Sequence, residues 1–246
     1  MTYWIFVFTT ALISGLFFYT AIRKAAMRLT AFQVFGVVQM VMLFGYALSR
    51  FGILLEQRLQ NGFWPPIGEW LNPQFHWYGA VLGVAVVWFC LLFIGYRNRQ
   101  NVQVFFGVLA QTACIIFFFG KLGCFADGHG GCIGGPTQLA WGVTYSWGDA
   151  ASAVPLHPAQ LYSALGVLLL FLLLRFKIGV MWSTAAFFLL HSLTEFWLEF
   201  LKPMPRLFLG SLSLAHVTYL AVFVVGAVGA MTMVWQRKNL PQISPN

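Results

Sequence analysis

The chain has 246 residues, of which 60% are hydrophobic and only 8% are charged. A soluble domain carries about 25% charged residues, so this composition excludes an ordinary water-soluble domain and predicts a protein whose solvent is lipid. The formal charge of +8 could suggest a nucleic-acid partner, but the basic residues are scattered at the ends of apolar segments. That distribution is typical of membrane-topology signals, and no nucleic acid is expected.

Seven apolar stretches are long enough to cross a bilayer, which takes about 20 residues. The first stretch has no basic residue before its apolar run, which argues against a cleaved signal peptide. No internal repeat or low-complexity tract is visible, so we expect a single membrane domain over residues 1–246. The predicted spans lie near residues 3–20, 30–49, 76–96, 102–120, 158–174, 180–200 and 210–235.

The basic residues also indicate how the spans are oriented, because Lys and Arg concentrate on the cytoplasmic side. Nine of the 14 Lys and Arg residues follow the first, third, fifth or seventh span, and five lie on the other side. We therefore predict an all-α polytopic membrane protein with seven transmembrane helices, its N-terminus outside and its C-terminus cytoplasmic. The nine residues are Arg23, Lys24, Arg28, Arg97, Arg99, Arg175, Lys177, Arg237 and Lys238.

Two outer connections carry most of the irregular sequence. Residues 50–75 begin with a stretch that could form an amphipathic interfacial helix and continue to a Pro-Pro break. Residues 121–157, between the fourth and fifth spans, form the longest connection, and the Gly-rich sequence GKLGCFADGHGGCIGG leads into it. Glycines permit unusual backbone angles and close approach of backbone N–H groups to an anion, so this loop is predicted to be the irregular wall of a lipid-phosphate site.

Polar residues of the spans converge toward the outer leaflet. Polar groups inside a span are costly and are functional candidates by default. All five histidines and four of the six acidic residues are predicted on this side, including His191, Glu195 and Glu199, which a spacing of four places on one helix face. The clustering predicts a polar cavity in the outer half of the membrane. The same face could instead be a structural hydrogen-bond ladder between helices.

Purely structural roles stay open for the other candidate residues. Lys121 could contact a phosphate or snorkel at the interface, and Asp127 with His129 could form an acid/base pair or a simple turn. His157, followed by a proline, could mark only a helix start. A metal site built from His191, Glu195 and His129 lacks a ligand motif, so no metal or other cofactor is expected.

The four cysteines fall into two pairs. Cys90 and Cys114 lie inside apolar runs and are expected in the core. Cys124 and Cys132 lie in or beside the Gly-rich loop and could form a disulfide if that loop faces an oxidising compartment, or could simply pack.

Three elements in order, GKLGCFADGHGGCIGG, PTQLAWGVTY and HPAQLYSAL, resemble the core of the bacterial prolipoprotein diacylglyceryl transferases. The resemblance covers roughly residues 76–202, and its H-P-x-Q-L-Y element is the most specific part. It implies seven spans in the bacterial inner membrane. It also implies the reaction, in which a diacylglyceryl group moves from phosphatidylglycerol to a cysteine thiol of a lipoprotein precursor without a metal.

The resemblance further implies which residues form the site. Lys121 stands where the family has an arginine, Tyr78 where a histidine is expected, and Glu195 where a late arginine falls. A lysine keeps the charge but loses the bidentate fork. These departures indicate a divergent member, for which a different acceptor or a non-catalytic lipid-binding role stays open. The expected catalytic residues are His129, Asp127 and Tyr78, and the expected substrate-binding residues are Lys121, Gly123, His157, Gln160, Tyr162, Glu199 and Lys202.

Overall fold

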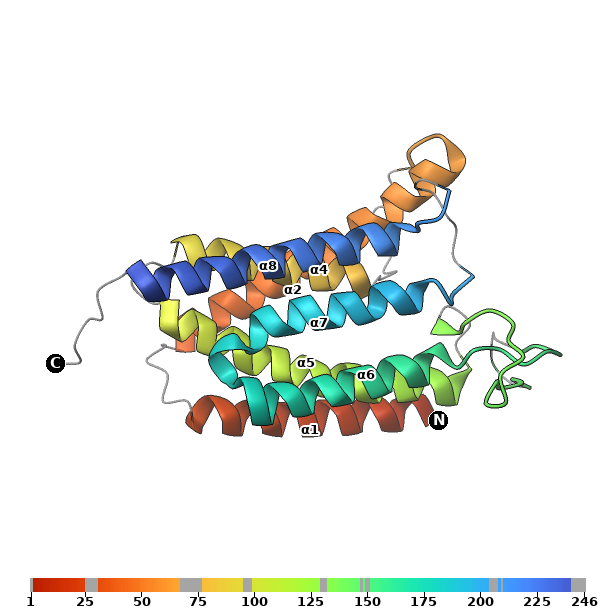
Figure 1. The fold of residues 1–246 in the computed structure, drawn as a ribbon, viewed down its shortest axis with the longest axis horizontal. Helices are drawn as coiled ribbons and strands as arrows, with labels where there is room; N and C mark the ends of the chain where they lie inside the picture. Colours follow the sequence, from red (N-terminus) through yellow and green to blue (C-terminus); the bar gives the residue numbers. More distant parts are fainter. Residues whose placement is uncertain are drawn as a thin grey trace.

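The structure is a computed structural model that describes residues 2–24, 31–66, 77–94, 99–128, 132–146, 148, 151–203, 208 and 210–239. Within these residues, seven long helices lie side by side along the long axis of the molecule (Figure 1). Their regular backbone satisfies each internal N–H and C=O, which a lipid surrounding requires. They are α1 (Thr2–Lys24), α2 (Ala31–Asn61), α4 (Trp77–Ile94), α5 (Arg99–Asp127), α6 (Ala159–Leu173), α7 (Val180–Glu199) and α8 (Leu214–Asn239), with a π-helical segment, η3 (Leu174–Ile178), continuing α6.

A helix covers most of each predicted span, and the chain is an all-helical membrane protein. Four helical stretches are long and apolar enough to cross a bilayer, and a shorter apolar one covers Tyr78–Leu92. Large apolar side chains are exposed along α1, α2, α6, α7 and α8, as expected where lipid is the solvent. The crossing of all seven helices, and their orientation, stay predictions. The four stretches are Gly36–Asn61, Gln100–Asp127, Ala159–Ile178 and Leu214–Lys238.

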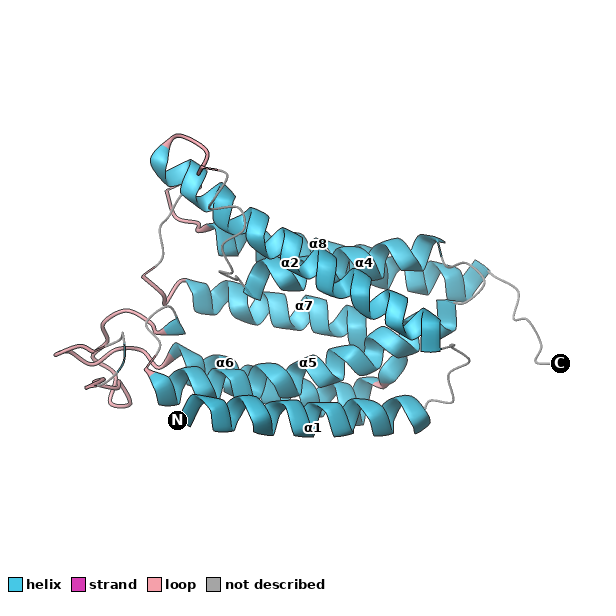
Figure 2. Cartoon of the chain, turned by 180° about the vertical axis from the view of Figure 1, so that it is seen from behind, coloured by secondary structure: helices cyan, strands magenta, loops and turns pink. Residues whose placement is uncertain are grey.

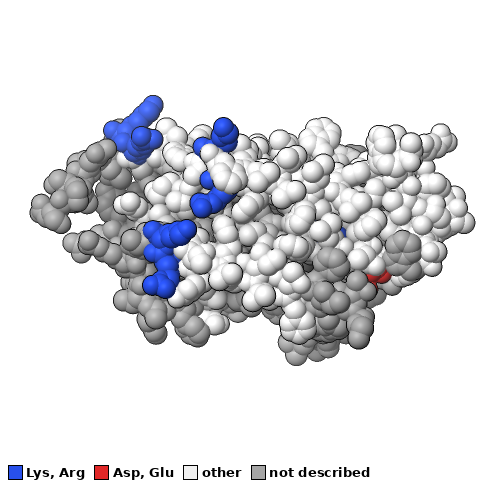
Figure 3. Space-filling model, turned by 90° about the horizontal axis from the view of Figure 1, so that it is seen from below, with Lys and Arg blue, Asp and Glu red and all other residues white. Residues whose placement is uncertain are grey.

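Most described loops gather at one end of the bundle, which we call the loop end (Figure 2). There α2, α5 and α7 finish and α6 and α8 begin. Figure 3 shows Lys and Arg side chains gathered toward the opposite end of the molecule. The last turns of α1, η3 and α8 each carry two basic residues. This charge asymmetry supports the predicted orientation, with the loop end outside.

Two predicted boundaries were wrong. The expected interfacial helix after residue 50 is the end of α2, which continues unbroken to Asn61 before Gly62 takes a positive φ of 80°. The Gly-rich sequence is helical through Asp127, and the backbone becomes irregular only from Gly128, whose φ is 65°. A glycine inside a helix costs only about 1 kcal/mol relative to alanine, and the packing of α5 against α6 and α7 offsets that cost.

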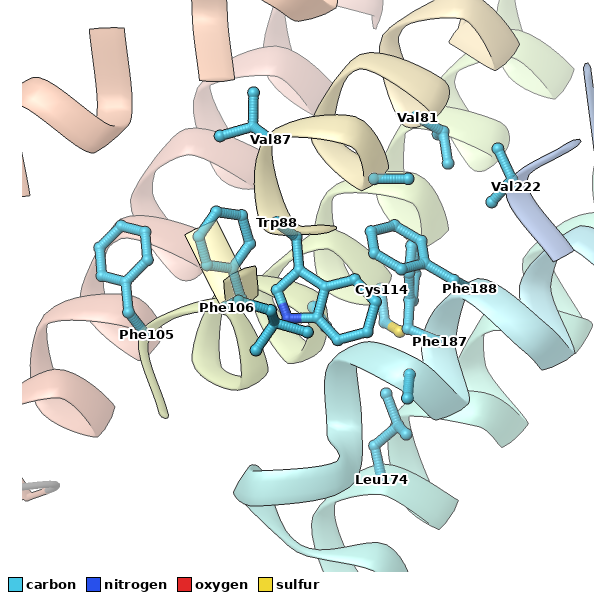
Figure 4. Packing of buried hydrophobic residues seen from close by; sticks show 14 of the residues in the cluster. Val81, Val87, Trp88, Phe105, Phe106, Cys114, Leu174, Phe187, Phe188 and Val222 are labelled. Carbon is cyan, nitrogen blue, oxygen red and sulfur yellow. The ribbon is translucent and has the colours of Figure 1, made fainter. Parts of the chain in front are cut away.

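The main core lies between α4, α5, α7 and α8 and is centred on Trp88 (Figure 4). The Trp88 ring lies 5.4 Å from the ring of Phe188, and both side chains are fully or almost fully buried. Cys114 lies in this core as predicted, but Cys90 is exposed, so its predicted burial was wrong. Because α4 buries the face that carries Trp88, Cys90, two residues on, points away from that face.

Small residues allow α2 and α4 to cross closely. A Cβ added to Gly83 would lie only 2.6 Å from the Cα of Gly45. In lipid, helices associate through close van der Waals packing rather than through the hydrophobic effect, and glycine permits that approach. The contact holds α4 in the register that brings Tyr78, at its first turn, to the loop end.

Candidate functional site

Four charged side chains meet at the loop end, between the last part of α5 and the end of α7. Lys121 Nζ lies 3.7 Å from Glu195 Oε2, and Lys202 Nζ lies 2.9 Å from Glu199 Oε2. Lys202 Nζ also lies 4.0 Å from Glu195 Oε2, which joins the two pairs. We call these four residues the charge cluster. Both carboxylate residues are buried, with 1% and 2% of their surface exposed.

Hydroxyl groups from α6 and from the residue before α8 position the carboxylates. The Ser163 hydroxyl, on α6, donates to Glu195 Oε1. The Ser213 hydroxyl, immediately before α8, donates to Glu199 Oε1 over 3.3 Å. Each carboxylate is therefore fixed by a hydroxyl on one side and by ammonium groups on the other. Hydrogen bonds to an ionised group are the stronger kind, worth about 1.5–3 kcal/mol each.

The position of Ser213 is fixed because it also caps the N-terminus of α8. Its hydroxyl oxygen accepts from the backbone N–H of His216 over 3.4 Å, three residues on, as a helix N-cap does. In return the backbone N–H of Ser213 donates to Nδ1 of His216 over 3.1 Å. The reciprocal pair resembles a capping box in which histidine replaces the usual glutamate. The local start of α8 thus carries the hydroxyl that holds Glu199.

Lys202 of the charge cluster keeps its charge in this setting. Burial alone would lower the pKa of Lys202, but Glu195 and Glu199 beside it outweigh burial and raise the pKa above its ordinary value. Lys202 is therefore protonated across the physiological pH range. The cluster consists of two ammonium groups and two carboxylates, so its formal charges balance.

A second polar pair joins α2 and α4 near the charge cluster. The Tyr78 hydroxyl donates to Glu56 Oε2 over 3.3 Å, and its ring packs edge-on against that of Tyr219 on α8, with 6.4 Å between centroids. Tyr78 lies within electrostatic reach of Glu199. Tyr78, which was predicted for the site, therefore lies beside the charge cluster. Its hydrogen-bond partner, Glu56, was not predicted.

The H-P-x-Q-L-Y element fastens the loop after α5 to the start of α6. The Tyr145 hydroxyl donates to Gln160 Oε1 over 3.4 Å, and Trp141 Nε1 donates to the Tyr162 hydroxyl over 2.7 Å. The backbone N–H of Gly134 donates to the His157 carbonyl over 2.9 Å. A Cβ at Gly134 would lie 2.5 Å from the Cβ of His157, so only glycine allows this approach.

Gln160 differs from its neighbours in this element. It is fully buried, and its Nε2 has no hydrogen-bond partner among the residues that the structure describes. It lies one turn before Ser163, so the two side chains share the helix face that meets Glu195. His157 and Tyr162 thus contact the loop, whereas Gln160 contacts the loop through Oε1 and also shares the helix face of Ser163.

The structure unites some predicted residues and separates others. Lys121, Glu199 and Lys202 come together in the charge cluster. Gly123 is buried within α5, while Asp127 is exposed at the end of that helix and outside the cluster. His129 lies outside the described residues.

The cysteine pair at this end of the bundle is unjoined. Cys124 and Cys132 are within hydrogen-bonding contact of each other, and no disulfide joins them. Among the residues that the structure describes, no group of three or more His, Cys, Asp or Glu side chains could hold a metal ion.

Glu195, Ser163, Ser213 and Glu56 complete the site. Glu195 was predicted in the polar cavity but not as a substrate-binding residue, and the other three were not predicted. For Glu195 a signal existed, because it shares a helix face with Glu199. Ser163 stands three residues after Gln160 and could have been found by the same periodicity. Glu56 offered no such signal, since its partner lies on another helix.

Comparison with known proteins finds a match to the family described as prolipoprotein diacylglyceryl transferase, over residues 71–232. The phosphatidylglycerol–prolipoprotein diacylglyceryl transferase of Chlamydia caviae is 28% identical over 164 residues, which are 61% of this chain and 54% of the relative. The corresponding protein of Clostridium tetani is 29% identical over 171 residues, 66% of this chain and 65% of the relative. That of Idiomarina loihiensis is 30% identical over 174 residues, 68% of this chain and 61% of the relative. The chain thus spans between about half and two thirds of the length of these relatives.

Proposed function

The chain belongs to the prolipoprotein diacylglyceryl transferase family, and from that premise we propose that it moves a diacylglyceryl group from a glycerophospholipid to a cysteine thiol of a lipoprotein precursor. Phosphatidylglycerol and prolipoprotein are the substrates in the names of its relatives. The observation that carries the proposal is that the family match encloses the whole charge cluster. The reaction would take place at the outer leaflet of the bacterial inner membrane, where the predicted orientation puts the loop end.

In this reaction the thiol sulfur forms a bond to the glyceryl carbon that carries the phosphate, and the carbon–oxygen bond to the phosphate breaks. A headgroup phosphate leaves, and the thiol proton passes to a base. Lys121 is the more exposed cation of the cluster, with 18% of its side chain accessible against 11% for Lys202. Its ammonium group has three N–H donors. It is therefore the group that would stabilise charge on the leaving phosphate.

The proposed proton acceptors are the two polar residues that the Gly-rich sequence predicts. Asp127, exposed at the end of α5, and His129 just beyond it would take the thiol proton as a thiol peptide approaches from the outer side. Tyr78 would orient the donor from the α4 side, with its hydroxyl directed by Glu56. Gln160 would supply its buried amide N–H groups to a lipid oxygen.

A transfer assay in vesicles tests the proposal. Vesicles would contain both phosphatidylglycerol and phosphatidylethanolamine, so that the test does not depend on the headgroup, and a lipobox peptide with one cysteine would be the acceptor. Mass spectrometry should find the peptide heavier by one diacylglyceryl group. Lys121→Ala should slow the transfer about 100-fold, the usual effect of removing one charge-stabilising donor, whereas Lys238→Ala, an exposed lysine at the opposite end, should not change it.

A non-catalytic lipid-binding protein is the second candidate, favoured by the observation that Lys121 already faces a buried carboxylate. The same assay separates the candidates. Folded protein that retains lipid but modifies neither a thiol nor a hydroxyl peptide would overturn catalysis and favour lipid binding. Transfer to a hydroxyl peptide alone would keep the enzyme and change the acceptor.

A further inference from the structure

Two buried side chains at the loop end have polar atoms that can bind a ligand. Glu195 Oε2, an acceptor, and Gln160 Nε2, a donor, have no hydrogen-bond partner within the described part of the chain. Only 1% of Glu195 and 0% of Gln160 is exposed. Lys121 Nζ and Lys202 Nζ attract the Glu195 oxygen from 3.7 Å and 4.0 Å but lie beyond hydrogen-bond distance. Buried polar atoms normally have a partner, so this donor and this acceptor point to a group on a ligand.

Ser163 relates the two side chains in space. Gln160 lies one turn before Ser163, so both side chains share one face of α6. The Ser163 hydroxyl donates to Glu195 Oε1, so that this face meets the Glu195 carboxylate. The oxygen of the Gln160 amide accepts from the Tyr145 hydroxyl over 3.4 Å. The amide therefore offers its N–H groups, and the carboxylate its second oxygen, to a ligand between α6 and α7.

A hydroxyl group fits this pair of atoms because it can donate one hydrogen bond and accept another. An ammonium group could donate to Glu195 but could not accept from Gln160. An ionised phosphate could accept from Gln160 but has no proton for Glu195, whose negative charge repels it. The pair thus favours a neutral group with both capacities.

We propose that Glu195 and Gln160 together bind a hydroxyl of the donor headgroup and so select phospholipids whose headgroup is hydroxylated, as glycerol is. The hydroxyl donates to Glu195 Oε2 and accepts from Gln160 Nε2, while the phosphate of the same headgroup lies against Lys121 Nζ. Since Lys121 Nζ is 3.7 Å from that carboxylate oxygen, one small headgroup can contact both. This inference rests on the proposed function only in taking the site to bind the donor lipid.

The hydroxyl contact would hold the leaving group of the transfer. The bond that breaks joins the glyceryl carbon to a phosphate oxygen, and the headgroup leaves with the phosphate. A hydroxyl bound at Glu195 and a phosphate bound at Lys121 fix the headgroup at two points, which orients the breaking bond toward the thiol. Glu195 and Gln160 are therefore positioning residues for the reaction.

Lipid retention tests the inference without requiring turnover. Purified protein, in a detergent without hydroxyl groups and with no peptide present, would be mixed with equal amounts of phosphatidylglycerol and phosphatidylpropanol that have the same acyl chains. The two headgroups have the same charge and carbon skeleton, but the propanol headgroup has no hydroxyl. Native mass spectrometry should find at least about tenfold more bound phosphatidylglycerol, as expected for a hydrogen bond to a charged group. Equal retention would overturn the inference, even if no variant could be purified.

Two variants assign the preference to the two residues. Glu195→Gln keeps an oxygen for Ser163 but puts N–H groups in place of Oε2, and Gln160→Met removes the amide. Each should bring the ratio of the two lipids to within about twofold, because one hydrogen bond to the hydroxyl is lost. The lipids carry the same charge, so the charge lost at Glu195 does not itself change their ratio.

A matched control makes the same substitution at another buried glutamine. Gln111 donates to Ser183 over 2.9 Å, and Gln111→Met should keep the preference for phosphatidylglycerol. An unaltered ratio in either Glu195→Gln or Gln160→Met would overturn the proposed pair.

Transfer from vesicles of a single lipid keeps this inference distinguishable from the proposed function. Equal transfer from phosphatidylpropanol and from phosphatidylglycerol vesicles would overturn the selection of a hydroxyl and leave the function standing. Preferential retention of phosphatidylglycerol without transfer from either vesicle would overturn the function and leave the binding inference standing.

Discussion

The charges of Lys121 and Glu195 should stabilise the folded state together, with a measurable coupling energy between them. We consider Lys121→Met and Glu195→Gln, which remove one charge each with little change in volume. Glu195→Gln leaves the hydroxyl of Ser163 an oxygen to donate to, so its main effect is electrostatic. Removing one partner of a buried ion pair leaves the other charge uncompensated, which costs about 3–5 kcal/mol.

The distance sets the magnitude of the coupling. Two unit charges 3.7 Å apart attract by about 4.5 kcal/mol at an effective dielectric constant of 20, and by about 1 kcal/mol in water. Glu195 is buried but Lys121 is partly exposed, so we expect a coupling of about 2 kcal/mol. Glu195→Gln alone should cost about 3 kcal/mol. Lys121→Met should cost about 2 kcal/mol, because Glu195 keeps Lys202 nearby.

The free energy of unfolding can be measured by SDS titration in mixed micelles for the four members of the cycle. The double variant should lose about 3 kcal/mol, less than the sum of the single losses by the coupling energy. Strictly additive losses, with a coupling below about 0.5 kcal/mol, would refute the view that these charges stabilise each other. Lys238→Met, at the opposite end, is the control and should combine additively with Glu195→Gln.

Three further predictions concern packing and reactivity. Ser163→Ala should lower the free energy of unfolding by about 1.5–3 kcal/mol in the same titration, because the buried carboxylate of Glu195 loses its hydroxyl donor. Ser163→Thr keeps the hydroxyl and should cost less. Equal losses in the two variants would contradict this prediction. Gly83→Ala should destabilise the protein by about 1–3 kcal/mol through overpacking, whereas Gly36→Ala, where nothing lies within 4 Å, should be neutral or slightly stabilising. Mild oxidation should join Cys124 to Cys132, seen as a loss of 2 Da and of two free thiols by mass spectrometry, and a loss that persists in Cys132→Ser would rule out this pairing.

The helices were predictable from sequence because long apolar runs in lipid leave few alternatives to a helix. The boundaries were less predictable, since they depend on contacts between helices. The glycines after Lys121 predict irregular backbone, but α5 continues to Asp127 because its neighbours pack against it. For the same reason α2 continues past the predicted end of its span.

The site was predictable as a set of polar residues but not as a set of pairs. The spacing of Glu195 and Glu199 indicated a common helix face, and Lys121 stood out beside the glycines. Nothing local indicates that Lys121 meets Glu195, because the contact depends on how α5 packs against α7. The serines that hold the carboxylates were missed because a serine near a helix start or inside a helix usually bonds to its own backbone.

The two carboxylates of α7 also have a consequence for biosynthesis. This helix is not among the four stretches apolar enough to cross a membrane by composition, since charged side chains in a span disfavour insertion by a few kcal/mol. Its stability in the bilayer therefore depends on partners, and they emerge from the ribosome at different times. Lys121 is already at the membrane when α7 is synthesised, Lys202 follows directly, and Ser213 comes last. We therefore expect α5 to hold α7 in the membrane first, and α7 to reach its final position only when α8 has been inserted.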